Sequence, residues 1–445
     1  MTKYSKETLI ELDKKHFIHP TSSIKQQQEE GPAFIFTKGD GVYLEDIDGK
    51  RYIDARSSLW NVNIGHGRKE LGEVAKKQID QMAFSSTFST YSHEPAIILA
   101  EKIANLAPDS LNAVFYTSGG SEANDTAYKF ARYYWKLKGK PGKAKIISRD
   151  RAYHGVSAGA TSATGIEDFW KLGILSPGFY HAKSPYQIDV KTAVDSIEEI
   201  IKREDPNTIA AFVAEPIQGS GGVVISSKEY LYEVKKLCEK YDILFIADEV
   251  ITGFGRTGEM FAVDHWGIEP DLLVFAKGVT SGYIPLGGVL VSDDIHEVFK
   301  SDDGVLSHGF TYSGHPVACA VALENIRIIE EENLVENTRQ MGKLLLDGFK
   351  KIEEETKIIG NVRAIGLLAG LELVDKENNK QFCSSLNMPN KFNDLLIDKG
   401  VLSRPITFGN ADIFGFAPPL SINEAEISKI VDAILETALE IEKDL

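Results

Sequence analysis

The sequence predicts an α/β fold with two domains: a large domain around a mostly parallel sheet, and a small α+β domain built from both chain ends. Two observations carry this prediction. Helical patterns alternate with short apolar runs between about residues 70 and 325, which is typical of a parallel sheet covered by helices. The length of 445 residues exceeds the roughly 250–300 at which a single core stops growing. We expect residues 61–325 to form the large domain, and residues 1–60 with 326–445 to form the small one.

The N-terminal part predicts a helix followed by an antiparallel sheet. Residues 1–30 are typical of a helix with a polar connection, which ends at Gly31-Pro32. Short strand-like segments follow, with Gly-Asp and Asp-Gly turn signals between them. These segments cover residues 33–40, 41–50 and 51–55.

The rest of the chain supplies the other elements. Helices are predicted over residues 70–83, 94–107 and 121–139. Apolar runs predict strands over residues 112–118, 144–149, 209–216, 242–250, 271–278 and 287–292. Acidic helices begin near residue 325, and a mixed region over 362–375 and 401–419 precedes a last helix at 422–445.

Composition narrows the class of protein. Hydrophobic residues make up 43% and charged residues 26%, as in an average globular protein, and the net charge of −16 argues against nucleic-acid binding. Three widely spaced cysteines without a CxxC or Cys/His cluster predict neither a zinc site nor a disulfide framework, so we expect no metal. No run reaches the roughly 18 apolar residues of a membrane span, and residues 1–17 lack the apolar stretch of a signal peptide. The expected location is the cytoplasm, without a membrane partner.

Lys277 and Asp248 are the first candidate catalytic residues, because each ends an apolar run. A lysine buried at such a strand end has a pKa lowered by desolvation and can act as an amine nucleophile. A carboxylate at the same edge would keep the pyridine nitrogen of a pyridoxal cofactor protonated, which makes the ring an electron sink. Spacing alone does not pair the two residues. A solvated strand-end lysine and a capping aspartate stay open at this point.

Residues 117–124, Thr-Ser-Gly-Gly-Ser-Glu-Ala-Asn, join a predicted strand to a helix. Their small side chains let backbone N–H groups close on an anion, and the helix N-terminus adds its dipole. This segment would therefore hold the phosphate of a cofactor, although it also suits an ordinary helix cap with Glu122 in the first turn.

Tyr153 follows the run 144–149 and would stack on a flat heteroaromatic ring, or equally belong to the core.

Two further sequence motifs are present, but the residues around them do not fit the sites that these motifs usually form. Residues 253–258 match the dinucleotide pattern GxGxxG, but no long helix follows them. Residues 155–159 match the nucleophile pattern GxSxG, but polar residues precede them instead of a buried strand.

Taken together, these segments resemble the class III aminotransferases, which use pyridoxal phosphate. Residues 244–278 are similar to the long signature of that family, with the carboxylate, the Gly-Phe-Gly-Arg-Thr-Gly turn and the lysine in register. The likeness spans nearly the whole chain, because it extends to residues 118–125, 152–155, 214–219 and 308–320.

The resemblance implies the fold of the aspartate-aminotransferase type and a homodimer with active sites at the subunit interface; whether dimers pair into tetramers stays open. Lys277 is expected to bind pyridoxal 5'-phosphate as a Schiff base, and Asp248 to pair with its pyridine nitrogen. The other expected cofactor-binding residues are Gly119, Gly120 and Ser121 at the phosphate, Tyr153 and Val250 at the two ring faces, Glu215, and Thr311 toward the cofactor of the neighbouring subunit.

The substrate pocket resembles that of the ω-amine:pyruvate and taurine:pyruvate transaminases. Residues 58–63 are similar to their Leu-Trp-x-Val-Asn loop, so Trp60 is expected to line the pocket with Phe88 and Tyr153. Arg404 lies where that group carries an arginine that swings to accept a substrate carboxylate. The implied reaction is ping-pong transfer from an ω-amine or ω-amino acid, such as β-alanine or taurine, to a keto acid.

The acceptor is predicted from Val156. Families that use γ-aminobutyrate, ornithine or acetylornithine commonly have arginine there, after the pair corresponding to His154-Gly155, so valine favours pyruvate. A diaminopelargonate-type or 2-oxoglutarate-dependent aminotransferase stays open, as does an aminomutase or epimerase of the same fold. A nicotinamide oxidoreductase built on residues 253–258 is the hypothesis from another class, and it predicts a protein without a lysine-linked chromophore.

Overall fold

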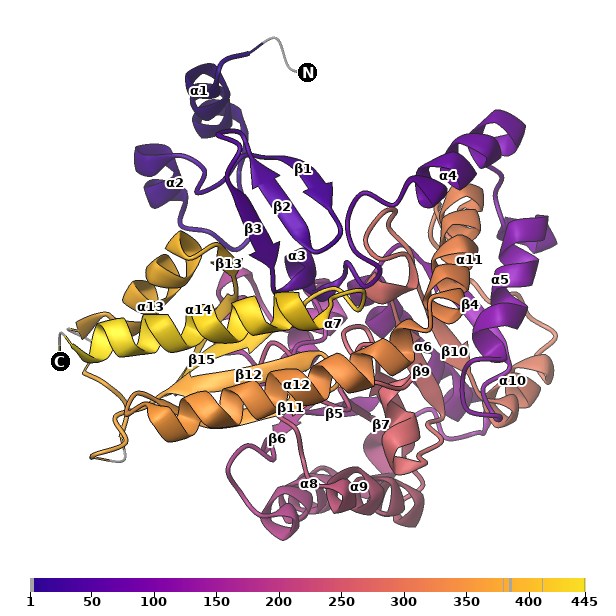
Figure 1. The fold of residues 1–445 in the computed structure, drawn as a ribbon. Coiled ribbons are helices and arrows are strands. Elements are labelled where there is room, and N and C mark those ends of the chain that lie inside the picture. Colours follow the sequence, from indigo (N-terminus) through magenta and orange to yellow (C-terminus); the bar gives the residue numbers. More distant parts are fainter. Residues whose placement is uncertain (1–3, 379, 384–385, 410, 444) are drawn as a thin grey trace.

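The computed structural model describes residues 4–378, 380–383, 386–409, 411–443 and 445. Figure 1 shows a large α/β body, with the N-terminal strands and the C-terminal helices gathered beside it. In the described part of the chain, no helix combines the length and the apolarity needed to cross a membrane.

A seven-stranded sheet forms the centre of the large body. Its order is β4–β10–β9–β8–β7–β5–β6, and neighbours run parallel except at β10, which is antiparallel to β4 and β9. The predicted mostly parallel sheet is thereby confirmed. The strands are β4 (Ala113–Thr117), β5 (Lys145–Arg149), β6 (Phe179–Ala182), β7 (Ile209–Ala214), β8 (Leu244–Asp248), β9 (Leu272–Phe275) and β10 (Gly287–Val291).

Strands β7, β9 and β10 are apolar throughout, and β8 is apolar up to its last residue, Asp248, because both faces of the sheet are buried here. Successive side chains of a strand point to opposite faces. Phe245 accordingly joins one core cluster and Ile246 the other, and Leu273 and Leu272 divide in the same way. Continuous apolar runs of this kind are typical of parallel strands with helices on both sides.

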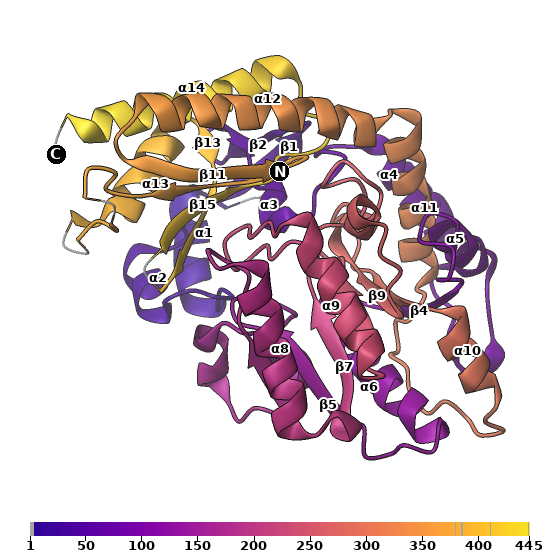
Figure 2. The ribbon, with the colours of Figure 1, turned by 90° about the horizontal axis from the view of Figure 1, so that it is seen from below.

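Helices cover the two faces. α6 packs on β7, β8, β9 and β10 from one side, while α8 and α9 pack on the other (Figure 2). The helices of the large body are α4 (Lys69–Met82), α5 (Glu94–Ala104), α6 (Gly120–Leu137), α7 (Ala158–Ala163), α8 (Val190–Glu204), α9 (Lys228–Lys240), α10 (Asp293–Lys300) and α11 (Pro316–Glu331). Short 3-10 turns are η1 (Phe88–Thr90), η2 (Glu167–Leu172), η3 (Pro206–Thr208), η4 (Ala262–Trp266) and η5 (Lys277–Val279).

Both chain ends build the smaller part, as predicted. Its two sheets have the orders β1–β2–β3–β13 and β11–β12–β15–β14, and β13 pairs in parallel with β3, so that Val401 lies opposite Ile53. The domain boundaries at residues 60 and 325 stay a prediction. The strands are β1 (Phe36–Asp40), β2 (Tyr43–Asp46), β3 (Arg51–Asp54), β11 (Ile359–Ile365), β12 (Leu368–Leu373), β13 (Val401–Leu402), β14 (Arg404–Phe408) and β15 (Ala411–Phe416); the helices are α1 (Lys6–His16), α2 (Ile24–Glu30), α3 (Ser57–Trp60), α12 (Leu334–Glu355), α13 (Met388–Asp398) and α14 (Glu424–Glu442).

Candidate active site

One edge of the central sheet collects most of the predicted site residues. Strands β4, β7, β8 and β9 run in the same direction, because β10 is antiparallel to both β4 and β9. Their carboxyl ends therefore meet at one edge, where α/β folds bind ligands. Asp248 is the last residue of β8, and Ser118, Glu215 and Lys277 follow β4, β7 and β9 within two residues.

Lys277 lies at this edge in a strained conformation. It begins η5 with φ of 47°, in the left-handed region that a residue other than glycine rarely adopts. Burial lowers the pKa of Lys277 to about 8; among nearby charges, Asp248 opposes that shift and Arg404 adds to it. A far larger fraction of this amine than of an ordinary lysine is therefore neutral, and nucleophilic, near neutral pH.

Asp248 is buried and held in one orientation. Its Oδ2 accepts a hydrogen bond from Asn124 Nδ2 at 2.8 Å and lies 2.7 Å from His154 Nδ1, while its Oδ1 accepts from the backbone N–H of Val250 at 3.1 Å. The sequence did not assign roles to Asn124 and His154. Asn124 stands one helical turn after Gly120, which was the available signal.

The N-terminus of α6 is open to an anion. Gly119 is its N-cap and no side chain caps it, so the first backbone N–H groups of an 18-residue helix remain available. A Cβ added at Gly119 would meet no atom within 4 Å, whereas one at Gly120 would lie 3.0 Å from Val250 Cγ1. The absence of a side chain at Gly120 thus lets this loop approach Val250. Ser121 Oγ accepts a hydrogen bond from the backbone N–H of Val156 at 3.1 Å.

Glu215 fixes the backbone of Tyr153. Glu215 Oε1 accepts from the N–H of Tyr153 at 3.1 Å, and its Oε2 accepts from the N–H of Gly219 at 2.9 Å. The ring of Tyr153 lies 5.2 Å from that of Phe169, and burial raises the pKa of its hydroxyl. The charges of Arg404, Asp248 and Glu215 all act on Tyr153, which places these groups around one site.

Trp60 and Arg404 form a second wall. The Arg404 guanidinium lies over the Trp60 ring, 5.7 Å from its centroid, and the ring itself is buried. Trp60 packs against two glycines: a Cβ at Gly219 would lie 2.5 Å from the indole, and one at Gly415 would lie 3.0 Å from it. Burial lowers the pKa of Arg404, and its charge acts on both Tyr153 and Lys277.

Phe88 and Thr311 lie apart from this cluster. Both are exposed. Phe88 packs on Gly309, where an added Cβ would lie 2.8 Å from its ring, and Thr311 follows two residues later. In the described part of the chain no contact joins either residue to Lys277 or Asp248, so their roles stay predictions.

Comparison with known proteins decides the family. The family model described as Aminotransferase class-III matches residues 24–439. The chain is a class III aminotransferase. This aminotransferase is 39% identical to the putrescine–pyruvate aminotransferase of Pseudomonas aeruginosa, over 94% of this chain and 93% of that protein. It is 38% identical to the diaminobutyrate–2-oxoglutarate transaminase of Halomonas elongata, over 95% and 94% of the two chains.

Solved structures agree with this assignment. The aminotransferase superimposes with a TM-score of 0.97 on a transaminase from the marine bacterium Virgibacillus, at 54% identity over 98% of this chain and 99% of that one. For an (S)-enantioselective ω-transaminase from Thermomicrobium roseum the TM-score is 0.94, at 44% identity over 99% of both chains. A PLP-bound amine transaminase from an uncultivated Pseudomonas species gives 0.91, at 36% identity over 96% and 98%. The fold is therefore that of the pyridoxal-phosphate-dependent transferases.

Pyridoxal phosphate is the cofactor of class III aminotransferases, and the site residues fit it. The desolvated amine of the half-buried Lys277, the oriented Asp248 carboxylate and the uncapped N-terminus of α6 match its aldehyde, its pyridine nitrogen and its phosphate in chemistry.

Proposed function

We propose that this class III aminotransferase moves an amino group from an ω-amine or ω-amino acid to pyruvate by a ping-pong mechanism. The observation that carries the proposal is the environment of Arg404. Its guanidinium lies over Trp60 and acts electrostatically on Lys277 and Tyr153. Among the described residues, no carboxylate forms an ion pair with it. A planar guanidinium without a carboxylate partner suits a substrate carboxylate.

The proposed acceptor, pyruvate, follows from Val156, an apolar residue at a position where related families carry arginine. Val156 is 59% exposed at the position where families that use γ-aminobutyrate, ornithine or acetylornithine commonly carry arginine. Pyruvate has one carboxylate and requires one arginine, and the Pseudomonas aeruginosa relative is a pyruvate enzyme by name. The Halomonas elongata relative is a 2-oxoglutarate enzyme by name, which makes 2-oxoglutarate the second candidate.

The roles proposed for the side chains follow from their contacts. When bound, pyridoxal phosphate supplies an electron sink and carries the amino group between donor and acceptor. Lys277 would hold the cofactor and then move the proton at its Nζ, for which a pKa of about 8 is suited. Asp248, kept in place by Asn124 and His154, would pair with the pyridine nitrogen. Gly119, Gly120 and Ser121 would bind the phosphate, and Tyr153 and Val250 would lie against the ring.

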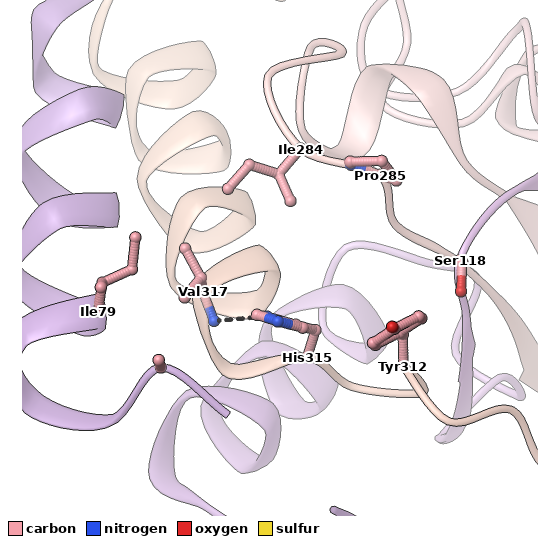
Figure 3. A pocket seen from close by; sticks show the side chains of 8 residues that line it. Ile79, Ser118, Ile284, Pro285, Tyr312, His315 and Val317 are labelled. Atoms are coloured by element: carbon pink, nitrogen blue, oxygen red, sulfur yellow. Dashed lines mark hydrogen bonds between the residues drawn. The ribbon is translucent and has the colours of Figure 1, made fainter. Parts of the chain in front are cut away.

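The proposed active site includes a second copy of the chain. A cavity of about 510 Å³ opens beside the phosphate loop, and Figure 3 shows apolar side chains turned into it. Ile79 and Tyr312 on its rim are 53% and 60% exposed. A partner subunit would cover this surface and bring Thr311 to the neighbouring cofactor. The lining residues are Ile79, Ala83, Ser118, Ile284, Pro285, Tyr312, His315 and Val317.

Absorbance spectroscopy of the purified protein tests the proposal. β-Alanine, taurine, putrescine and a simple monoamine are added in turn, followed by pyruvate or 2-oxoglutarate. We expect a visible band that an ω-amine bleaches and that pyruvate restores faster than 2-oxoglutarate does. Faster recovery with 2-oxoglutarate would overturn the acceptor, and a band that returns without any keto acid would favour the aminomutase hypothesis.

A further inference from the structure

Arg151 is a buried arginine held between two aromatic rings. Its guanidinium carbon lies 3.8 Å from the centroid of Tyr186 and 4.2 Å from that of Phe408. Only 7% of the residue is exposed, and its Nε donates to the carbonyl of Gly221 at 2.9 Å. The predicted site uses neither Arg151 nor its two aromatic partners.

One side of this contact is anchored to strands β11 and β12 of the smaller part. The hydroxyl of Tyr186 donates to Glu372 Oε1 at 2.8 Å, and Glu372, on β12, also forms an ion pair with Arg363 at 2.7 Å. Arg363 Nε donates in turn to the carbonyl of Val223 at 2.8 Å. Tyr186 is therefore a fixed platform against which the Arg151 guanidinium rests.

The other side of the contact carries the strand that holds Arg404. Among the described residues, β14 is an edge strand that pairs only with β15. Burial alternates along β14, with residues 404, 406 and 408 partly buried and residues 405 and 407 exposed. Arg404 and Phe408 thus share one face, and Phe408 is the anchor of that face at the end of the strand.

Arg151 also adjoins the cofactor-facing tyrosine. It adopts φ of 64°, its N–H donates to the carbonyl of Gly165 at 2.8 Å, and Tyr153 follows two residues later. One guanidinium therefore joins the Tyr153 segment, the Tyr186 platform and the Arg404 strand.

We propose that Arg151 is a positioning residue for Arg404: by clamping Phe408 it sets the distance of the Arg404 guanidinium from Tyr153 and Lys277. The inference rests on the proposed role of Arg404 as the substrate-carboxylate ligand. An edge strand has hydrogen bonds on one side only, so its position depends on side-chain contacts of this kind. The clamp acts on carboxylate recognition, and it reaches the chemistry at Lys277 only through the charge of Arg404.

Phe408→Ala is the principal variant, studied in the pyridoxal-phosphate-loaded enzyme. We expect the KM for pyruvate to rise about tenfold, the range of a desolvated cation–π contact, with kcat within about twofold of the parent. The half-reaction with a monoamine that has no carboxylate should stay within about twofold. The dissociation constant of propionate, a carboxylate that cannot accept an amino group, should rise with the KM in calorimetric titrations.

Conservative variants separate the clamp from simple packing. Phe408→Tyr keeps the aromatic face, so its KM for pyruvate and its kcat should equal those of the parent. Phe408→Leu keeps apolar volume without that face, and Arg151→Lys keeps the charge without the planar stack, so both should raise the KM for pyruvate. Either serves if Phe408→Ala does not fold. Tyr232→Ala is the matched control, since it removes a ring from an exposed pair with Lys236, at 4.3 Å on α9, and should change nothing.

Arg404→Ala distinguishes failure of the inference from failure of the proposed function. If Arg404→Ala raises the KM for pyruvate, the double variant with Phe408→Ala should raise it no further, because Phe408 acts through Arg404. Equal losses with monoamine and pyruvate in Phe408→Ala, or additive effects in the double variant, would overturn the positioning role alone. An unchanged KM in Arg404→Ala would overturn the role of Arg404 and, with it, this inference.

Discussion

At the scale of single residues, Lys277 combines a strained backbone conformation with a desolvated amine. Its left-handed backbone and lowered pKa are features that cost stability and that occur at functional sites. We predict that Lys277→Ala abolishes transamination, lowering kcat by at least about a thousandfold. The variant should still bind pyridoxal phosphate non-covalently, because the phosphate loop and Asp248 are intact. Mass spectrometry after borohydride reduction checks the covalent bond, and near-normal turnover would refute the assignment of Lys277.

The pKa of Lys277 gives a pH dependence. Only the neutral amine attacks an aldehyde, so covalent uptake of the cofactor by apoprotein should accelerate as pH rises through about 8 and then level off. Arg404 contributes to the low pKa, so Arg404→Ala should move the midpoint upward. Absorbance-monitored uptake between pH 6 and pH 10 measures both. A parent midpoint near the ordinary value of 10.5 would mean that burial does not act on this amine.

Residues that end strands were accessible to sequence analysis, and residues that act through space were not. Asp248 and Lys277 each end an apolar run, which marked each of them as a candidate from the sequence, but spacing alone did not pair them. The parallel pairing of β8 and β9 brings them to one sheet edge. The partners of Asp248 come from helix α6 and from the loop after β5, which no local pattern brings together. The Arg151 contact was invisible for the same reason, since Phe408 lies far along the chain.

At the scale of elements, Glu249 fastens the segment that follows β8. It is fully buried, accepts a hydrogen bond from Thr252 Oγ1, and accepts another from the N–H of Val263 at 2.8 Å. These contacts close the loop that contains the Gly-Phe-Gly-Arg-Thr-Gly turn. Burial raises the pKa of Glu249 to about 7, against the hydrogen bonds that lower it.

That shift predicts a stability profile. An ordinary glutamate has a pKa of 4.5, so the folded protein binds this proton more tightly than the unfolded chain does. The stabilisation is full below pH 4.5 and is lost as pH rises from 4.5 to about 7. Glu249→Gln has no proton to lose. At pH 8 its free energy of unfolding should therefore exceed that of the parent by on the order of 1–3 kcal/mol.

Denaturant titrations at pH 5 and pH 8 measure this difference. The two proteins should have similar stability at pH 5 and separate at pH 8. A glutamine variant that is less stable by the same amount at both values would show that the hydrogen-bond geometry of Glu249, and not its ionisation, determines stability.

Elements also differed in how well the sequence predicted them. Strands β7 and β9 are apolar along their whole length, as is β8 up to Asp248, and all three were predicted within a few residues. β6 was missed, because its four residues Phe179–Ala182 include a histidine and lie at the sheet edge. The helix α3 was not predicted either, since Ser58 and Leu59 inside it have non-helical backbone angles that tertiary contacts impose.

At the scale of the whole molecule, Arg256 joins the two chain ends to the central sheet. It is fully buried without an ion-pair partner in the described residues; its guanidinium donates to the carbonyl of Leu367 at 3.1 Å and to that of Pro418. It also donates to Ser57 Oγ at 3.2 Å and to Asn63 Oδ1 at 3.0 Å. The segment that carries Trp60 is thus fixed by contacts from distant parts of the chain.

The expected homodimer interface is the last feature at this scale. The apolar surface around Ile79 and Tyr312 lines the same cavity as Ser118, so we expect a homodimer that buries it. Ile79→Asp would place a carboxylate without a partner in that interface, which costs several kcal/mol, so the dimer dissociation constant should rise at least about a hundredfold. Cofactor should be lost in parallel, because Thr311 would no longer reach the neighbouring site.

Sedimentation velocity over a range of protein concentrations measures the association, with cofactor content read from absorbance in the same cell. Tyr232→Asp is the matched control, since Tyr232 is equally exposed but lies on α9, which contributes no residue to the lining of the cavity. It should leave both the association and the cofactor content unchanged. A monomeric parent with full cofactor and full activity would contradict the interface and remove Thr311 from the site. Dimers that persist in Ile79→Asp would place the interface on another surface, and the open cavity beside Ser118 would then be solvent-filled in the working enzyme.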